Sequence, residues 1–431
     1  MCGLRKFSVS LLLSAMAGSS LAGDFNGELK SQSAYGLDSN NLQQQEWLLD
    51  LEYTRALWGG DLTVIGRARI DTHDQLNHSS IPATYSAARG PVVVDDVGTL
   101  ELREMYWDYS GDSIYWRVGK QQVVWGEADG LKLLDVINPQ SFREFILDDF
   151  DDSRIPLWML NVEYSLDNGG VIQSLWIPDT TTHHLAPAGS PFAFTSPLFV
   201  PQRPEGVELI LEEAKAPSLS LKNGDSGIRY LQFVGGWDIS VNYLYHYIDA
   251  PLVRSNSVGS KLRVTQEYER SHLFGGTLSN AFGDWTLRAE LAYETDRYHR
   301  DLKASTGVSR ADQWSSVVGI DFQGFTDQFI SMQWFQASIR KNSEMLVANR
   351  REEQLTFLWE SKFFNEVLTF KYLHLHSLDH DDGMLQTKLT YNLESSLDVY
   401  ARADFFYGDS DRLFGQFESA DRVALGFEWG F

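Results

Sequence analysis

The chain has 431 residues, a formal net charge of −23 and an aromatic content of 13%. This acidic balance argues against nucleic-acid binding, because proteins that bind nucleic acids are usually basic, and against docking on anionic lipid by charge. After the first residues there is no run of about 18 or more apolar residues, which excludes helical membrane spans. Composition alone fits both an outer-membrane β-barrel and a secreted all-β sugar-binding protein.

Residues 1–22 are predicted to be a secretory signal peptide. A short basic start, Arg5-Lys6, precedes an apolar run over 7–17, and the small residues at 20–22 fit a cleavage site. The apolar run is too short to span a bilayer. The only cysteine, Cys2, lies in this signal, so the mature chain is expected to have no disulfide bonds.

Residues 23–431 are predicted to form a single transmembrane antiparallel β-barrel. In stretches such as 285–293 and 397–405, every second residue is apolar and the residues between are polar, as expected when one face meets lipid and the other the lumen. Tight turns alternate with long polar loops, residues 250–262 among them, which is typical of short periplasmic turns and long external loops. This pattern predicts eighteen strands, or sixteen if the three weakest predicted strands, 158–166, 170–177 and 227–234, do not form.

The chain ends on an alternating strand with three aromatic residues, Phe427, Trp429 and Phe431. It resembles the C-terminal strand by which the barrel-insertion machinery recognises outer-membrane barrels. We therefore predict that these three residues form an outer-membrane insertion signal.

Within the predicted strands, the alternation assigns one set of charged side chains to the lumen. Both signs occur, often on adjacent strands, so each residue either stabilises the wall by pairing or sets the selectivity of a pore. The predicted lumen-lining residues are Asp50, Glu52, Arg67, Arg69, Arg288, Glu290, Asp321, Glu360, Lys388, Asp398, Arg402 and Asp404, together with Glu428.

Loop 122–157 differs from a free external loop. It holds eight acidic and three basic residues, but also many large apolar side chains, such as Leu133, Ile137 and Phe145. A segment folded into the barrel mouth or lumen would bury these groups and narrow the pore, and a short helix is predicted over 140–150. The predicted constriction or gating residues are Trp125, Asp129, Asp135, Asn138, Arg143, Glu144, Asp148, Asp149, Asp151, Asp152 and Arg154.

No cofactor and no metal site are predicted. The acidic run 148–152 offers the oxygen ligands that Ca²⁺ prefers, but it lacks the spaced acid-glycine-glutamate order of an EF-hand. We expect these carboxylates to be solvated, or paired with Arg143 and Arg154.

Loop 178–226 is predicted to be a proline-rich extracellular loop, because it holds seven of the 12 prolines. Phe192, Phe194 and Phe199 lie between these prolines, so the loop is expected to act as an apolar lid over the mouth or as a surface for a partner. The adjacent His183 and His184 are expected to be exposed loop residues rather than metal ligands.

Residues 117–130, with the runs 135–139, 143–144 and 148–150, resemble a proteobacterial family of outer-membrane barrels of unknown function, distantly similar to alginate-export porins. The detailed match covers residues 115–160. The resemblance implies transport alongside a periplasmic lipoprotein-sorting-like protein and an inner-membrane efflux transporter, which favours an apolar or lipid-like cargo. The sequence therefore predicts a porin-like channel without enzymatic activity in the outer membrane of a Gram-negative bacterium, surrounded by outer-membrane lipid and lipopolysaccharide, and passing a small or apolar compound.

Functions other than a channel fit the sequence less well. A structural or adhesive barrel stays open as an alternative, because long loops permit it. A barrel enzyme with its site at the rim is disfavoured: His374, His376 and His380 cluster near an outer loop, but no serine-containing phospholipase motif accompanies them. A TonB-dependent receptor is excluded, because it needs a 22-stranded barrel and a large N-terminal plug, for which too few residues precede the first hairpin.

Overall fold

The structure is a computed structural model, and the predicted signal peptide, residues 1–22, lies outside its described residues. The described residues are 23–73, 85–86, 90–94, 97–202, 205–212, 216–259, 261–341 and 346–431.

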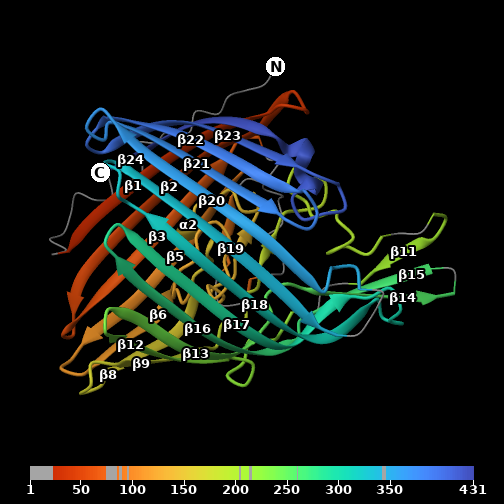
Figure 1. Cartoon of the computed structure of the whole chain (residues 1–431), viewed down its shortest axis with the longest axis horizontal. Helices are drawn as coiled ribbons and strands as arrows, with labels where there is room; N and C mark the ends of the chain where they lie inside the picture. The colour runs from red at the N-terminus through yellow and green to blue at the C-terminus, as the bar shows by residue number, and fades with distance from the viewer. Residues whose placement is uncertain are drawn as a thin grey trace.

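Eighteen antiparallel strands of the described chain close into a barrel (Figure 1). The first and last strands pair with each other, from Glu28 opposite Gly430 to Gly36 opposite Arg422. The prediction of eighteen strands is confirmed, and the three weakest predicted strands are present as β8, β9 and β12. In chain order the strands are β1 (Asp24–Gly36), β2 (Asn41–Leu57), β3 (Gly60–Asp71), β5 (Gly98–Ser110), β6 (Ile114–Gln121), β8 (Leu157–Ser165), β9 (Val171–Ile177), β12 (Asp225–Val234), β13 (Trp237–Tyr247), β16 (Arg270–Phe282), β17 (Trp285–Arg300), β18 (Val308–Phe322), β19 (Gln328–Arg340), β20 (Arg351–Phe363), β21 (Leu368–Ser377), β22 (Gly383–Glu394), β23 (Leu397–Tyr407) and β24 (Arg422–Gly430).

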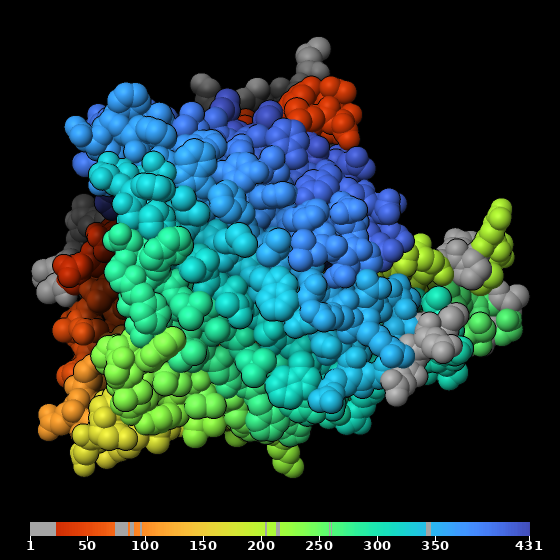
Figure 2. All heavy atoms as spheres, viewed as in Figure 1, coloured from red at the N-terminus to blue at the C-terminus, as the bar shows by residue number. Residues whose placement is uncertain are grey.

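Shorter elements complete the structure at the ends of the strands and inside the barrel. β4 (Val92–Val94) pairs with β5, and β7 (Ser141–Phe142) pairs with β10 (His184–Leu185). A separate sheet of β11 (Glu208–Leu211), β15 (Lys261–Glu267) and β14 (Leu252–Val258) projects beyond the barrel at the right of Figures 1 and 2. The predicted loop 250–262 is therefore largely a hairpin. The helical turns are α2 (Phe150–Ser153) and η2 (Gly415–Ala420).

No helix among the described residues combines the length and apolar character needed to cross a membrane. The helix predicted over 140–150 is wrong, because most of that stretch forms the short β7 strand and turns, and helix α2 begins only at Phe150. The physical reason is that Arg143 and Glu144 are both held by the barrel wall, and Phe145 adopts a positive φ of 55°. A residue with that left-handed backbone conformation cannot be part of a continuous right-handed helix.

Period-2 alternation places opposite kinds of side chain on the two faces of the wall. Ile70, Leu291 and Leu425 expose their apolar side chains outward, whereas the nearby Arg67 and Glu290 are buried. Apolar residues also pack inside the barrel, in two clusters to which the segment between β6 and β8 contributes. The interior is thus occupied by chain, and the pattern of buried charges follows from what that chain contacts.

Candidate functional site

Residues 122–156, between β6 and β8, form a segment that lies across the lumen. The two strands pair directly at their ends, Gln121 opposite Leu157. A tight turn would therefore suffice to connect them, yet the intervening chain runs inward and contacts the wall at several places. We call residues 122–156 the lumen segment.

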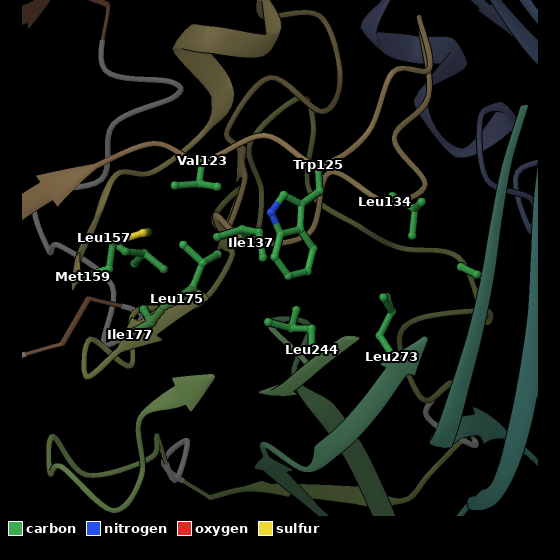
Figure 3. Packing of buried hydrophobic residues seen from close by; sticks show 11 residues of the cluster. Val123, Trp125, Leu134, Ile137, Leu157, Met159, Leu175, Ile177, Leu244 and Leu273 are labelled. Atoms are coloured by element: carbon green, nitrogen blue, oxygen red, sulfur yellow. The ribbon is translucent and has the colours of Figure 1, made fainter. Parts of the chain in front are cut away.

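The first contact of the lumen segment is made by Trp125. Its indole is fully buried and donates from Nε1 to Oε1 of Gln173 on β9, at 2.7 Å. The ring lies against Gly227 on β12, where an added Cβ would come within 2.7 Å of the indole. Figure 3 shows Trp125 directed toward Leu244 of β13, within a cluster that also contains Leu134 and Ile137 of the lumen segment.

The second contact is with the wall formed by β17 to β19. Asp129 pairs with Arg288, which also pairs with Asp321 at 2.9 Å between Nε and Oδ2. The backbone N of Asp129 donates to Oε1 of Gln333 at 3.1 Å. Glu290 accepts hydrogen bonds from the backbone N atoms of Glu127 and Leu134. The predicted lumen residues Arg288, Glu290 and Asp321 thus meet the predicted gating residue Asp129.

Three predicted residues, Asn138, Asp135 and Arg154, hold the lumen segment together internally. Asn138 accepts at Oδ1 from the backbone N of Val123 at 2.8 Å, and donates from Nδ2 to the backbone O of Ile155 at 3.0 Å. Asp135 pairs with Nε of Arg154 at 2.8 Å. These contacts fix the incoming and returning parts of the segment to each other. The lumen segment is therefore held together as one unit.

The third contact is with the wall formed by β24, β23 and β2. Glu144 accepts from Nη2 of Arg422 and from Nε2 of Gln44, both at 2.7 Å, and Arg143 pairs with Glu46 at 2.6 Å. Asp404, predicted to line the lumen, pairs with Nε of Arg422 at 2.9 Å. Arg402, also predicted, pairs with Asp404 and donates to the backbone O of Leu147.

The fourth contact is with β1, β3 and β5. Asp152 pairs with Arg67 at 2.6 Å and with Lys30 at 3.0 Å, and Arg67 also holds Asp50 at 2.7 Å. Arg103 donates to the backbone O atoms of residues 151, 152 and 154. The acidic run is therefore partly paired: Asp151 contacts Arg154, as expected, whereas Arg143 pairs with Glu46 and Glu144 instead.

The remaining predicted lumen residues contact other parts of the wall. Arg69 pairs with Glu46, Lys388 with Glu428, and Asp398 accepts from Asn392. Glu52 accepts from Thr54, and Glu360 lies opposite Lys371 in the strand register. Among the described residues, no hydrogen bond or ion pair joins these side chains to Asp148 or Asp149.

Among the residues that hold the lumen segment, sequence reasoning missed the charged residues Lys30, Glu46, Arg103 and Arg422 and the amides Gln44, Gln173 and Gln333. Arg422 could have been assigned to the lumen from the sequence, because it lies on the same face of its strand as the predicted lumen residue Glu428. Arg103 could not have been assigned in this way, because a register shift between Ile65 and Gly66 disturbs the pairing of β3 with β5 beside it.

A cavity of about 560 Å³ opens at the end of the barrel that carries the long loops. Its lining includes Phe142 and Phe145 of the lumen segment, Phe194 and Phe199 of the loop between β9 and β12, and Ile339 at the end of β19. Its size lies within the roughly 300–1,000 Å³ that is typical of small-molecule sites. We call this cavity the mouth pocket.

His183 and His184 are not the exposed loop residues that were expected. Nδ1 of His183 accepts a hydrogen bond from the backbone N of Gln140 at 2.9 Å, and the imidazole packs against Phe142 at 5.1 Å between ring centroids. Burial lowers the pKa of His183 to about 3. The reason is that the loop docks on the lumen segment through the β7–β10 pair. There the ring of His183 packs against Phe142 and the ring of His184 packs against Tyr85.

The predicted histidine cluster at the rim divides into two groups. His374 and His376 both contact the hydroxyl of Tyr407, at 2.8 and 2.9 Å. His380 instead contacts the side-chain amide of Asn349 at 3.0 Å.

A closed antiparallel barrel with a chain segment inside its lumen defines the class of porin-like β-barrels, and solved structures agree. OccAB3 from Acinetobacter baumannii matches with a TM-score of 0.53 and 11% identity, over 95% of this chain and 99% of that chain. OpdK from Pseudomonas aeruginosa matches with a TM-score of 0.53 and 10% identity, over 94% and 98%. A BenF-like porin from Pseudomonas fluorescens Pf-5 matches with a TM-score of 0.52 and 11% identity, over 95% and 98%. The fold is that of outer-membrane porins.

The chain belongs to the family described as "Protein of unknown function (DUF1302)", whose profile matches residues 21–427. This agrees with the resemblance to a barrel family of unknown function. No curated protein matches the sequence significantly.

Proposed function

We propose that the protein is a channel in the outer membrane of a Gram-negative bacterium, that the lumen segment closes it at rest, and that it moves its cargo without chemical change. The observation that carries this proposal is the attachment of the segment to well-separated parts of the wall. Arg67 on β3 holds Asp152, and Arg288 on β17 holds Asp129. These strands are separated along one side of the ring by β5, β6, β8, β9, β12, β13 and β16.

The chemistry of these contacts favours a gate over a permanent filling. A permanent filling is built most stably from apolar side chains, since the desolvation of buried ion pairs offsets much of their attraction. The lumen segment packs on the wall through two apolar clusters, but it also meets the wall through buried charges and hydrogen bonds, and these have discrete alternative partners. Arg288 keeps Asp321, and Arg67 keeps Asp50, when the segment leaves. The wall therefore retains compensated charges in an open state.

The mouth pocket supports a small or apolar cargo. Its largely apolar lining is shared between the lumen segment and the loops above it. A molecule that enters from the long-loop side, which we assign to the cell exterior, meets the gate through Phe142 and Phe145. An occupant of this pocket therefore touches the element that has to move.

Planar-bilayer recording tests this function. Residues 123–155 are replaced by a four-residue Gly/Ser linker, which the pairing of Gln121 with Leu157 permits. The deletion is expected to give steady, high conductance, whereas the wild type gives rare openings. The control replaces 252–267, in the projecting sheet, by the same linker and is expected to behave as wild type. Equal conductance of wild type and deletion would contradict the gate, and no conductance from either folded protein would contradict the channel.

A further inference from the structure

Three cationic residues lie together at the long-loop end of the barrel. Arg340 ends β19, Lys341 follows it, and Arg350 directly precedes β20. The backbone N of Ile339 donates to the backbone O of Arg350 at 2.8 Å, so the ends of the two strands are adjacent. No ion pair within the described part of the chain involves any of the three. We call Arg340, Lys341 and Arg350 the rim cations.

Two further arginines flank the rim cations, each with an acidic partner. Arg310 on β18 pairs with Asp296, and Arg351 on β20 pairs with Glu353. The two arginine side chains are 60% and 61% exposed. Nζ of Lys341 donates to the backbone O of Arg310 at 3.2 Å, so the flanking arginines and the rim cations form one continuous group.

Two carboxylates near this group have no cationic partner of their own among the described residues. Asp312, opposite Arg340 in the strand register, accepts a hydrogen bond from the hydroxyl of Tyr293 at 2.7 Å. Asp379 accepts from the backbone N of Glu353 at 2.6 Å. These two carboxylates do not match the three rim cations, so a local positive charge remains in a chain whose net charge is −23.

The group faces outward from the barrel and not into the mouth pocket. Ile339 and Glu352 line that pocket, and successive residues of a strand point to opposite faces of the wall. Arg340 and Arg351 therefore lie on the outward face. The outward surface of β18, β19 and β20 is turned toward the viewer in Figure 2.

Strand register places the rim cations just beyond the apolar band of the barrel. Ser338 lies opposite both Trp314 on β18 and Arg351 on β20. The indole of Trp314 is 37% exposed on the outward face, and such rings favour the interface between membrane and water. Arg340 lies two residues further out, which is about 7 Å along the strand. That is the level of the lipid head groups.

We propose that the rim cations bind a phosphate group of lipopolysaccharide, the phosphorylated glycolipid of the outer leaflet. A phosphate monoester carries a charge of about −1.5 to −2 and three acceptor oxygens. Arginine binds such oxygens through paired N–H donors, and lysine binds them as a point charge. Below the rim cations, the exposed Met332 and Phe357 lie opposite each other on β19 and β20, where they would contact the acyl chains. The proposal rests on the outer-membrane location under the proposed function, but not on the gate.

The test is native mass spectrometry of the mature protein released from detergent micelles, with counting of bound lipid. The probes are diphosphorylated lipid A and the same lipid A after removal of both phosphates. The wild type is expected to retain one molecule of the phosphorylated form, with at least about ten-fold preference. The triple variant Arg340→Gln, Lys341→Gln, Arg350→Gln is expected to bind this form about ten-fold more weakly, because each basic residue near the membrane surface adds to the attraction.

The control is the triple variant Lys222→Gln, Lys261→Gln, Arg263→Gln, which makes the same change of charge on exposed residues of a loop and of the projecting sheet. It is expected to bind as the wild type does, and gel shift on heating shows that each variant is folded. Equal binding by the wild type and the rim variant, or equal weakening in the control, would overturn the proposal.

Two further outcomes concern the chemistry of the ligand. Equal binding of lipid A with and without its phosphates would contradict phosphate recognition. Displacement of lipid A by an equal concentration of inorganic phosphate would show a site for free phosphate and would overturn the assignment to lipid. Because no current is measured, a failure to bind lipid A is distinguishable from a failure to conduct.

Discussion

Arg422, at the start of the last barrel strand, donates from Nη2 to Oε2 of Glu144 at 2.7 Å, and the two side chains are 0% and 1% exposed. Strand β24 closes the barrel by pairing with β1, whereas Glu144 lies in the lumen segment. One buried ion pair therefore links the strand that closes the barrel to the segment that lies across the lumen. Removing one partner of such a pair leaves a buried charge uncompensated, which typically costs about 3–5 kcal/mol.

Substitution of Glu144 is therefore expected to loosen the lumen segment. Glu144→Ala should destabilise the docked segment by about 3 kcal/mol, at the lower end of that range because Arg422 keeps Asp404. The measurement is open probability in single-channel recordings, which should rise strongly. The control is Asp151→Ala in the same segment, where the side chain is 91% exposed and the ion pair contributes at most about 1 kcal/mol. Equal open probability of the two variants would contradict the role of Glu144.

Trp125 is expected to be the main apolar anchor of the lumen segment. Trp125→Ala should reduce stability by about 3–5 kcal/mol, because it leaves a cavity against Gly227 and Leu244. Trp125→Phe keeps most of the ring and should cost about 1–3 kcal/mol, since Gln173 loses its donor. Unfolding in detergent with added urea measures both variants. An alanine variant as stable as the phenylalanine variant would show that the indole does not anchor the segment.

Phe431 is predicted to matter for assembly more than for the finished barrel. It exchanges two backbone hydrogen bonds with Gly27, at 2.8 and 2.9 Å, and its ring lies tilted against that of Trp429, with 4.9 Å between ring centroids. Phe431→Ala leaves the backbone bonds in place and removes the terminal aromatic group. We expect slower insertion into liposomes that contain the barrel-insertion machinery, followed by gel shift on heating, and little change without the machinery. The control is Phe25→Ala, because Phe25 is an exposed residue on β1. Equal slowing of both variants would contradict the prediction that Phe431 is part of an insertion signal.

Acid is expected to release the loop that carries His183. Its pKa is about 3 in the folded protein and is near its ordinary value of 6.5 when the loop is released, so the released state binds more protons between these values. The docked loop is fully stabilised above pH 6.5 and loses that stabilisation as the pH falls toward 3. Amide protection factors of residues 183–200 should fall accordingly. His183→Asn keeps an acceptor for Gln140 without titrating, so a pH dependence unchanged in this variant would contradict the assignment.

The barrel could be predicted from sequence because each strand carries its own local signal. Alternation, turn residues and the position of prolines are set within about ten residues, and lipid-facing and lumen-facing positions cannot exchange without burying charge in lipid. The same signal named Arg288 and Asp404 as lumen residues. The strands within 250–262 could not be predicted, because β15 pairs in part with β11, a parallel strand that is distant in sequence.

The partners across the lumen could not be predicted in this way. Glu144 contacts Arg422, and Asp129 contacts Arg288, over long sequence separations that no periodicity encodes. The predicted helix over 140–150 failed for the same reason, since contacts of Arg143 and Glu144 with the wall override local propensity. His183 was misjudged because its acceptor role depends on Gln140, which reaches it only through tertiary folding.

Accessibility of the lumen from the outer side tests the central claim most directly. The mature chain is expected to lack cysteine, so Asp398→Cys places one thiol on the inward face of β23 near its short-turn end, and Glu418→Cys places one on an exposed turn at the opposite end. Intact cells are treated with the impermeant reagent 2-(trimethylammonium)ethyl methanethiosulfonate. We predict labelling at 418 but not at 398 in the full-length protein, and labelling at both after deletion of 123–155. Rapid labelling at 398 with the lumen segment present would contradict a channel closed at rest.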